Sequence, residues 1–171
     1  MNIENYIRDV KDFPIEWISF KDITPILSDI DAFNHVIEEF SKSLDWIDKL
    51  VALDARWFIF AWALSYKLWI PFIPVRKKWK LPFETISQKY DLEYGTNTFE
   101  IHIDSINSWD KIAIIDDLLA TWWTARASVD LVEKLWWIVK SLNFVIDLTF
   151  LNWSDKLKWY KIDEITFLGS L

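Results

Sequence analysis

Apolar residues recur along the chain at two different spacings, and each spacing predicts a different type of element. Asp31 is a suitable N-cap for a helix, because its side chain can accept hydrogen bonds from free N–H groups. The apolar residues that follow recur at intervals of four, three and four, at Phe33, Ile37, Phe40 and Leu44. This periodicity predicts an amphipathic helix with one face on a core.

Short apolar runs alternate with segments of helical spacing over most of the chain. The runs that predict strands are 50–53, 71–75, 111–115 and 139–150, and the segments that predict helices are 59–68 and 124–135. Two aspartates end the third of these strands. Because strands and helices alternate, we expect an α/β fold with a mostly parallel central sheet flanked by helices. Such folds bind ligands at the carboxyl ends of their strands.

The segment 76–88 interrupts this alternation. It is basic, contains Pro82 and shows no clear periodicity, so we expect a long loop. The alternating runs 90–94 and 99–103 lie on either side of Gly95 and predict a hairpin. A long loop followed by a hairpin in the middle of an α/β chain indicates a flap.

Length, charge and composition exclude several classes of protein. The 171 residues suit a single domain with a sizeable core, and the net charge of -7 gives no reason to expect binding to nucleic acid or to an anionic membrane. The longest apolar run covers about eight residues, whereas a membrane-spanning helix needs roughly 20. The first residues lack the pattern of a secretory signal, and the chain has no cysteine. We therefore expect a cytoplasmic protein.

The glycine content is abnormal for an α/β protein. Glycine usually makes up about 7% of a chain, or roughly 12 residues at this length. This chain has 2 glycines and 13 tryptophans. Because glycine adopts positive φ without steric cost, tight turns and close approaches to a ligand depend on it. With so few glycines, such turns must be made by other residue types.

The aspartates that end the third predicted strand carry the clearest chemistry. At a sheet edge, Asp116 and Asp117 can accept hydrogen bonds from sugar hydroxyls, although an Asp-Asp pair alone can also simply end a strand. The loop that follows opens a helix whose free N–H groups can bind a phosphate. Its residues are Ala120, Thr121, Trp122, Trp123 and Thr124. The whole segment 112–125 resembles the phosphoribosyl pyrophosphate signature of the type I phosphoribosyltransferases, in the adenine-specific form whose loop reads Ala-Thr-Gly-Gly-Thr.

Two earlier segments also resemble the adenine phosphoribosyltransferase family. The segment 13–25 is similar to the family's N-terminal hood. The resemblance implies that Phe20 stacks on adenine, while backbone groups of Ser19 and Lys21 contact the edge of the base. The segment around Arg56 is similar to the family's pyrophosphate loop and implies that this arginine binds pyrophosphate and takes part in catalysis. A guanidinium suits that role because its planar fork matches phosphate oxygens.

The middle of the chain continues the resemblance. The basic segment 76–82 is similar to the family's Arg-Lys-x-Gly-Lys-Leu-Pro loop. It implies that Arg76, Lys77 and Lys80 bring further positive charge to the pyrophosphate, although a basic loop by itself is also explained by solvation. Glu93 and Tyr94 match the flap motif Glu-Tyr-Gly. In this motif the glutamate is implied to transfer the purine proton and the tyrosine to cover the site, which makes both catalytic residues.

The end of the chain completes the match. The segment 145–157 is similar to the family's closing motif and implies that Leu148 borders adenine, although Ser154 replaces the family's arginine. The whole resemblance implies a type I phosphoribosyltransferase fold in one domain, with a hood at about 1–30 and a flap at about 76–103.

The implied reaction joins adenine to phosphoribosyl pyrophosphate and yields AMP and pyrophosphate, as in purine salvage. It implies that Mg²⁺ is needed and is held mainly by the substrate, and that two copies form a homodimer. A relative that uses another purine is an alternative, because the base is contacted largely by backbone groups. A non-catalytic, nucleotide-sensing regulator is a second alternative. Such a regulator is expected to carry a basic surface or an added DNA-binding segment, and this sequence has neither.

Every tryptophan of the chain falls where the family has or tolerates glycine. The positions are Trp17, Trp46, Trp57, Trp62, Trp69, Trp79, Trp109, Trp122, Trp123, Trp136, Trp137, Trp153 and Trp159. Independent mutations would not produce this coincidence, and glycine at all of them would bring the glycine content close to the usual share. We therefore hypothesise that one codon, UGA, encodes glycine in the source and has been translated as tryptophan. Indoles in the phosphate loop would oppose its geometry and occupy ligand volume.

Overall fold

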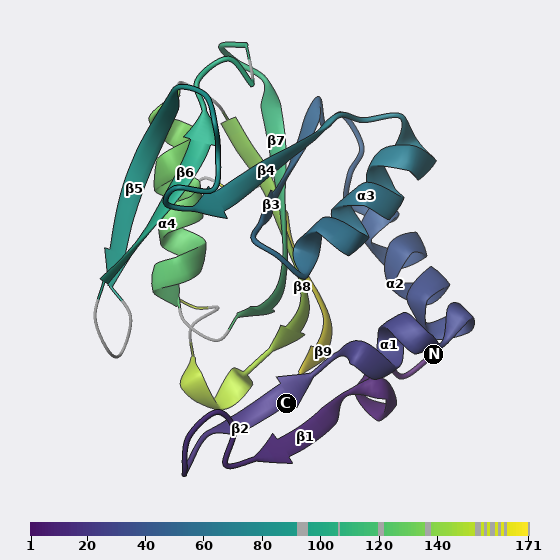
Figure 1. Ribbon diagram of the computed structural model, residues 1–171. Helices are drawn as coiled ribbons and strands as arrows, with labels where there is room; N and C mark the ends of the chain where they lie inside the picture. Colours follow the sequence, from purple (N-terminus) through teal and green to yellow (C-terminus); the bar gives the residue numbers. More distant parts are fainter. Residues whose placement is uncertain are drawn as a thin grey trace.

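A seven-stranded sheet forms the centre of the protein in the computed structural model (Figure 1). Its strands are β3 (Lys49–Leu53), β4 (Phe72–Lys77), β5 (Thr85–Asp91), β6 (Thr96–His102), β7 (Lys111–Leu119), β8 (Ile138–Asp147) and β9 (Glu164–Ser170). They lie in the order β5-β6-β4-β3-β7-β8-β9. The structure describes residues 1–91, 96–105, 107–119, 122–135, 138–152, 155, 157, 160, 162 and 164–170.

The sheet is mostly parallel, as expected. β3 pairs in parallel with β4 and β7, and β8 pairs in parallel with β7 and β9. Only the hairpin β5–β6 joins the sheet in antiparallel fashion, through the pairing of β6 with β4, among the strands that the structure describes. Since parallel strands all run the same way, the carboxyl ends of β3, β7 and β8 meet at one edge.

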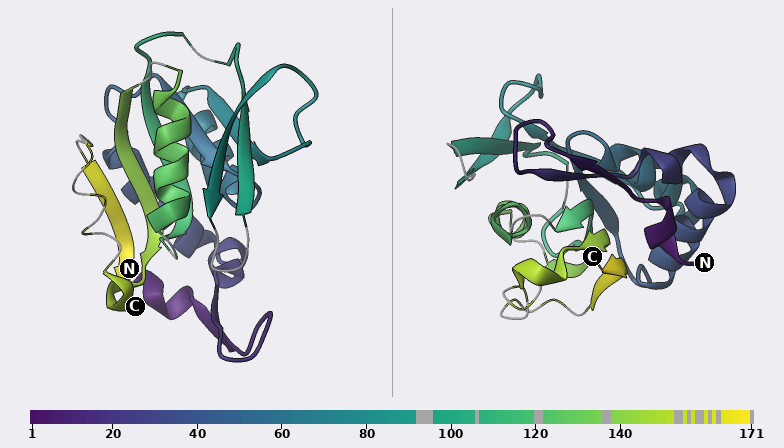
Figure 2. Two further views of the ribbon diagram at one scale, coloured as in Figure 1. Left: turned by 90° about the vertical axis from the view of Figure 1, so that its left-hand side faces the viewer. Right: turned by 90° about the horizontal axis from the view of Figure 1, so that it is seen from below.

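Helices cover both faces of the sheet, which confirms the predicted α/β architecture. The helices α2 (Ile30–Lys42) and α3 (Trp57–Leu68) lie on one face, and α4 (Trp122–Glu133) lies on the other (Figures 1 and 2). Between these layers, residues 50–53 of β3 and 112–115 of β7 are at most 3% exposed. No helix in the described part of the chain is long and apolar enough to cross a membrane.

The N-terminal segment forms a small unit beside the carboxyl ends of the strands. It contains the 3-10 helix η1 (Ile3–Tyr6), the antiparallel strands β1 (Arg8–Lys11) and β2 (Ser19–Asp22), and the short helix α1 (Thr24–Ser28). η1 packs closely on β9, because a Cβ atom at Gly169 would lie 3.2 Å from Cγ2 of Ile3. Packing on the last strand of the sheet holds the beginning of the hood in place.

The structure corrects several predicted boundaries. The N-cap of α2 is Asp29, whose carboxylate accepts the N–H groups of Asp31 and Ala32 at 3.1 and 2.9 Å, so Asp31 lies inside the first turn. The predicted loop 76–88 is wrong at both ends, because β4 continues through Lys77 and β5 begins at Thr85. Pairing of β5 with the full length of β6 makes this polar segment extended, so the hairpin expected from the runs 90–94 and 99–103 begins earlier, at Thr85.

Two further strands differ from their prediction. β7 continues to Leu119, so Asp116 and Asp117 lie within the strand rather than after it. β8 ends at Asp147, and the chain then turns into the 3-10 helix η2 (Thr149–Leu151) instead of continuing to 150 as a strand. β9 was not predicted, because its pattern is too short and mixed to stand out. Each difference arises from pairing or chain reversal in three dimensions, which a local pattern does not encode.

Five tryptophans adopt the left-handed backbone conformation. Their φ angles range from 57° to 76°, and their side chains are 71% to 93% exposed, at Trp17, Trp46, Trp69, Trp79 and Trp109. Positive φ is a genuine outlier for a bulky residue, because Cβ crowds the backbone. The other described non-glycine residues with positive φ are Asp12 and Asn152, which belong to types that tolerate it. The backbone at these five turns has the conformation that favours glycine.

Two tryptophans of α3 allow a direct test of this strain. Trp69 is the left-handed C-cap, with φ of 57° and its N–H donating to the carbonyl oxygen of Ser65, whereas Trp62 lies inside the helix and is 73% exposed. We expect Trp69→Gly to stabilise the protein by about 1 kcal/mol and Trp62→Gly to destabilise it by about 0.5 kcal/mol. Urea unfolding of the two variants measures both changes. A destabilising Trp69→Gly would show that the cap is not strained.

Candidate active site

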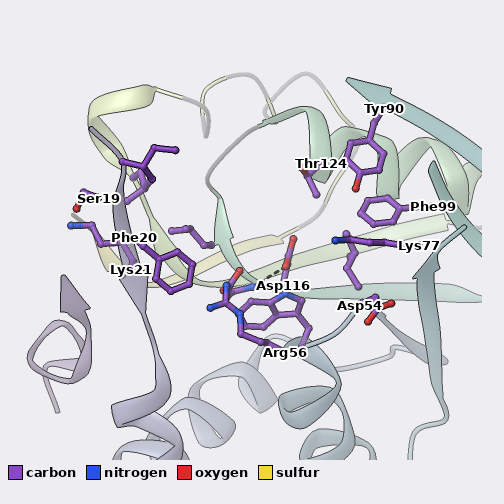
Figure 3. Close-up of a pocket in the computed structure, with 16 residues that line it drawn as sticks. Ser19, Phe20, Lys21, Asp54, Arg56, Lys77, Tyr90, Phe99, Asp116 and Thr124 are labelled. Carbon is purple, nitrogen blue, oxygen red and sulfur yellow. Dashed lines mark hydrogen bonds and ion pairs between the residues drawn. The ribbon is translucent and has the colours of Figure 1, made fainter. Parts of the chain in front are cut away.

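A cavity of about 430 Å³ lies where the carboxyl ends of the parallel strands meet the hood and the hairpin β5–β6 (Figure 3). The residues that line it are Ile18, Ser19, Phe20, Lys21, Leu53, Asp54, Arg56, Trp57, Lys77, Tyr90, Phe99, Asp116, Asp117, Leu118, Thr124 and Leu148. They come from β2 and the residue before it, from β3 to β7, from the loop after β3, from the starts of α3 and α4, and from the residue after β8. The fold therefore gathers side chains from most of the chain at the position where α/β folds bind ligands.

Most of the described site residues that the sequence predicted lie in this one cavity. They are Ser19, Phe20, Lys21, Arg56, Lys77, Asp116, Asp117, Thr124 and Leu148. Two others lie elsewhere: Arg76 has its Nε atom 3.3 Å from a carboxylate oxygen of Asp54, and Lys80 is exposed in the turn after β4. The cavity residues come from five separate predicted motifs, so the motifs converge in space as well as following in order.

Some of the predicted residues cannot be located in the cavity. Glu93, Tyr94, Ala120 and Thr121 lie outside the described residues. Trp122 and Trp123 form the first turn of α4, but only their backbone is described. The predicted roles of these residues stay predictions.

The aspartate pair of β7 is buried. Asp116 and Asp117 are each 6% exposed, and the N–H group of Asp117 donates to a carboxylate oxygen of Asp116 over 3.0 Å. Burial raises the pKa of Asp116 well above its ordinary value, and the neighbouring charge of Asp117 raises it further. Burial also raises the pKa of Asp117, to about 7, although Arg56 lowers it. Two carboxylates this close cannot both be charged without a cation beside them.

Arg56 supplies that cation. One of its terminal nitrogens lies 2.7 Å from a carboxylate oxygen of Asp117. Its guanidinium carbon also lies 5.1 Å from the ring centre of Phe20 and 5.5 Å from that of Trp57, both within the range of a cation–π contact. Figure 3 shows the side chain of Arg56 between the ring of Phe20 and Asp116. One side chain thus links the hood, the loop after β3 and the aspartate pair.

The start of α4 and the cations around the cavity create sites for anions. The first N–H groups of a helix have no partner within the helix and favour a negative charge. Thr124 lies in this first turn and lines the cavity, while the hydroxyl of Ser128 donates to its carbonyl oxygen at 3.1 Å. Lys21, Arg56 and Lys77 line the same space. A ligand with more than one phosphate group fits this distribution of charge.

The part of the chain that the structure describes contains no cluster of three or more metal-ligating side chains. The cavity offers carboxylates at Asp54, Asp116 and Asp117. Mg²⁺ commonly binds one or two carboxylates together with phosphate oxygens of a substrate. The residues present therefore fit a Mg²⁺ ion that arrives with a phosphorylated ligand.

Several cavity residues were not assigned a role from the sequence, among them Tyr90, Phe99 and Asp54. Tyr90 and Phe99 lie on paired strands of the hairpin, and their rings stack with centres 4.3 Å apart. Asp54 follows β3 and has a side chain that is 10% exposed. An aromatic residue in an alternating strand is ordinarily a packing residue, so the sequence gave no reason to single out Tyr90 or Phe99.

Comparison with known proteins identifies the family. No family model matches the chain. The chain is, however, 51% identical over 170 residues to the adenine phosphoribosyltransferase of Thermosipho africanus, and the match covers 98% of this chain and 100% of the relative. The chain belongs to the adenine phosphoribosyltransferase family. It is therefore a phosphoribosyltransferase, an enzyme of the glycosyltransferase class.

Solved structures of family members have the same fold. The adenine phosphoribosyltransferase of Thermoanaerobacter pseudethanolicus superimposes with a TM-score of 0.91 at 46% identity, covering 99% of this chain and 98% of the other. The enzyme of Saccharomyces cerevisiae, solved with adenine and an imino-altritol bisphosphate, gives a TM-score of 0.89 at 33% identity, covering 97% and 96%. These likenesses confirm the type I phosphoribosyltransferase fold that the sequence motifs implied.

The raised pKa of Asp117 predicts a pH-dependent stability. Because the folded state favours the protonated carboxyl, this contribution is complete below the ordinary pKa of aspartate and is lost as pH rises through about 7. From pH 5 to pH 8 we expect the free energy of unfolding to fall by on the order of 2–3 kcal/mol more in the parent than in Asp117→Asn. Urea titrations at several pH values measure this difference. The exposed Asp45→Asn is the control, and equal slopes in all three proteins would contradict the assignment.

Proposed function

We propose that the protein transfers the phosphoribosyl group of phosphoribosyl pyrophosphate to N9 of adenine, giving AMP and pyrophosphate. The observation that carries the proposal is the position of Arg56, with its guanidinium 5.1 Å from the ring centre of Phe20 and 2.7 Å from Asp117. An aromatic platform for a base, a cation for a leaving group and carboxylates for a sugar thus adjoin one another. The similarity to relatives named for this activity supports the same proposal.

The ligand would lie with its base at the hood and its phosphates at the other cavity walls. Phe20 offers a stacking face for adenine, with Leu148 bordering it and backbone groups of Ser19 and Lys21 beside it. Asp116 and Asp117 would accept hydrogen bonds from the ribose hydroxyls. The first turn of α4 would bind the 5′-phosphate through its free N–H groups.

Catalysis would rest on neutralising the leaving pyrophosphate. As its bond to the anomeric carbon breaks, positive charge develops on the sugar and negative charge on the pyrophosphate. Arg56 and Lys77 line the cavity and would stabilise that negative charge, while Arg76 and Lys80 stay predictions, since neither lines the cavity of its own chain. Bound Mg²⁺ would add positive charge at the same oxygens. Glu93 would accept the proton that adenine N9 loses.

This reaction gives the first test of the proposal. A chain with glycine at all 13 tryptophan positions should form AMP from adenine and phosphoribosyl pyrophosphate in the presence of Mg²⁺, and much less from guanine or hypoxanthine. Product formation is measured by chromatography, and Glu93→Gln should lower the turnover number more than it changes the KM for phosphoribosyl pyrophosphate. Equal use of the three purines would reject the adenine assignment and favour the alternative of another purine.

We further propose that two copies form a homodimer through the outer face of α3. This face carries Ile59 and Tyr66, which are 43% and 84% exposed, on either side of position 62, whose tryptophan is 73% exposed and is proposed below to be glycine in the natural protein. Together with Ala63 and Ser65 they line a groove of about 610 Å³. A contiguous exposed apolar surface of this kind is typical of protein interfaces. Sedimentation of a monomer at assay concentrations would exclude the dimer.

The cytoplasmic location expected from the sequence stays a prediction.

We also propose that glycine is the natural residue at the 13 tryptophan positions. The left-handed backbone at Trp17, Trp46, Trp69, Trp79 and Trp109 supports this, because glycine adopts it without strain. The high exposure of these five side chains supports it too, since none of the indoles is buried in the core. The remaining eight positions are supported by the resemblance alone: Trp57, Trp62, Trp122, Trp123, Trp136, Trp137, Trp153 and Trp159.

If glycine is the natural residue at these positions, two measurable properties follow: the codon used in the gene and the activity of the glycine-bearing chain. All 13 positions should use UGA in the source gene, while Gly95 and Gly169 use ordinary glycine codons. Indoles at Trp57, Trp122 and Trp123 would disturb the pyrophosphate and phosphate loops. The chain with tryptophan at all 13 positions should therefore bind phosphoribosyl pyrophosphate far more weakly than the chain with glycine there. Gene sequencing and parallel assays of both chains measure this. UGG codons at these positions, or comparable activity of the two chains, would disprove the recoding.

A further inference from the structure

Tyr90 is held in a fixed position on the wall of the cavity. It lies on β5, is 8% exposed, and stacks on Phe99 of β6 with ring centres 4.3 Å apart and planes inclined by 21°. Phe99 in turn is paired with Lys77 of β4 in the sheet. The three side chains line the same cavity from neighbouring strands, and Figure 3 shows the hydroxyl of Tyr90 directed toward the space beside Lys77.

The hydroxyl of Tyr90 has no hydrogen-bond partner among the described residues. A tyrosine hydroxyl in a largely buried ring usually has a hydrogen-bond partner, and this one is directed into the cavity, where a ligand can supply the acceptor. The charge of Asp116 affects the hydroxyl, but the carboxylate of Asp116 accepts a hydrogen bond from the N–H group of Asp117. Burial, with a smaller effect from Asp116, raises the pKa of Tyr90 to about 12, so the hydroxyl keeps its proton at neutral pH. The cavity thus contains a fixed, neutral O–H donor.

The surroundings of this hydroxyl indicate an anionic acceptor. Lys77 and Thr124 line the same part of the cavity in Figure 3, whereas Ser19, Phe20 and Lys21 lie on the opposite side. We propose that Tyr90 binds phosphoribosyl pyrophosphate by donating a hydrogen bond from its hydroxyl to a phosphate oxygen. Stacking on Phe99 fixes the direction of this donor. This role deepens the proposed function and rests on it for the identity of the substrate.

The variant Tyr90→Phe removes the hydroxyl and keeps the stacked ring. A hydrogen bond to a charged group is strong, so we expect the KM for phosphoribosyl pyrophosphate to rise roughly 10- to 100-fold in the glycine-bearing chain. The KM for adenine at saturating phosphoribosyl pyrophosphate should stay within about twofold. Tyr6→Phe, which removes a hydroxyl outside the cavity, should change neither value. The midpoint of thermal unfolding should be the same in Tyr90→Phe and Tyr6→Phe.

Measuring ligand binding directly tests the role of the Tyr90 hydroxyl independently of the reaction. Calorimetric titration with inorganic pyrophosphate and with ribose 5-phosphate shows which phosphate the hydroxyl binds, because Tyr90→Phe should weaken one of them about tenfold or more. If the parent binds these ligands but forms no AMP, the proposed function fails while the role of Tyr90 still stands on the binding data. If the parent binds neither ligand, the role of Tyr90 is rejected.

The variant Phe99→Leu distinguishes the loss of a hydrogen bond from a change in packing around Tyr90. This variant keeps the hydroxyl and removes the ring that supports it, so it should weaken phosphate binding less than Tyr90→Phe does. Equal weakening in both variants would assign the effect to packing and overturn the proposal. Binding constants of Tyr90→Phe within twofold of the parent for both ligands would overturn it as well.

Discussion

The pairing of Arg56 with Asp117 is the contact on which the site depends. Two neighbouring carboxylates are buried at the end of β7, and burial penalises the charged form of each. The guanidinium, 2.7 Å from Asp117, offsets part of that penalty and lowers the pKa of that carboxyl. The contact can form because β3 and β7 are parallel neighbours, so that the loop after one strand lies beside the end of the other. The order of the strands in the sheet therefore determines which charged groups of the site lie next to each other.

The same contact links the parts of the cavity that a two-substrate reaction would use. The guanidinium that pairs with Asp117 also lies against the ring of Phe20. It thus makes an ion pair at the sheet edge and a cation–π contact with the hood. A bound phosphate forms charge-assisted hydrogen bonds with a guanidinium, as the carboxylate of Asp117 does, so the two would compete for Arg56. An anion that draws Arg56 toward itself would free one face of Phe20 and leave Asp117 available to a sugar hydroxyl. In this way the occupancy of the anion side would affect the base side.

The sequence correctly predicted those elements and site residues whose signal lies within a short segment of the chain. The spacing of Phe33, Ile37 and Phe40 predicted α2 correctly, and the ordered motifs predicted most of the described cavity residues. The N-cap of α2 was misplaced by two residues, because Asp29 and Asp31 are chemically equivalent candidates. The hairpin was predicted only in part: β5 begins at Thr85, inside the expected loop, because β6 lies beside it along its whole length, and this pairing also places Tyr90 on the cavity wall. Local patterns do not encode such contacts.

The tryptophans affect the fold and the site to different extents. Each left-handed turn that carries an indole costs about 1–2 kcal/mol, so the five observed turns together cost about 5–10 kcal/mol. A domain of ordinary stability has about 5–15 kcal/mol in total, so strain of this size is comparable with the whole stability of the fold. The five indoles are exposed, so they strain the backbone without displacing the core. Trp57 differs, because it is 5% exposed, stacks on Phe60 and lies 5.5 Å from the guanidinium of Arg56. An indole there occupies space beside the arginine that the anion needs, so its effect would fall on binding rather than on folding.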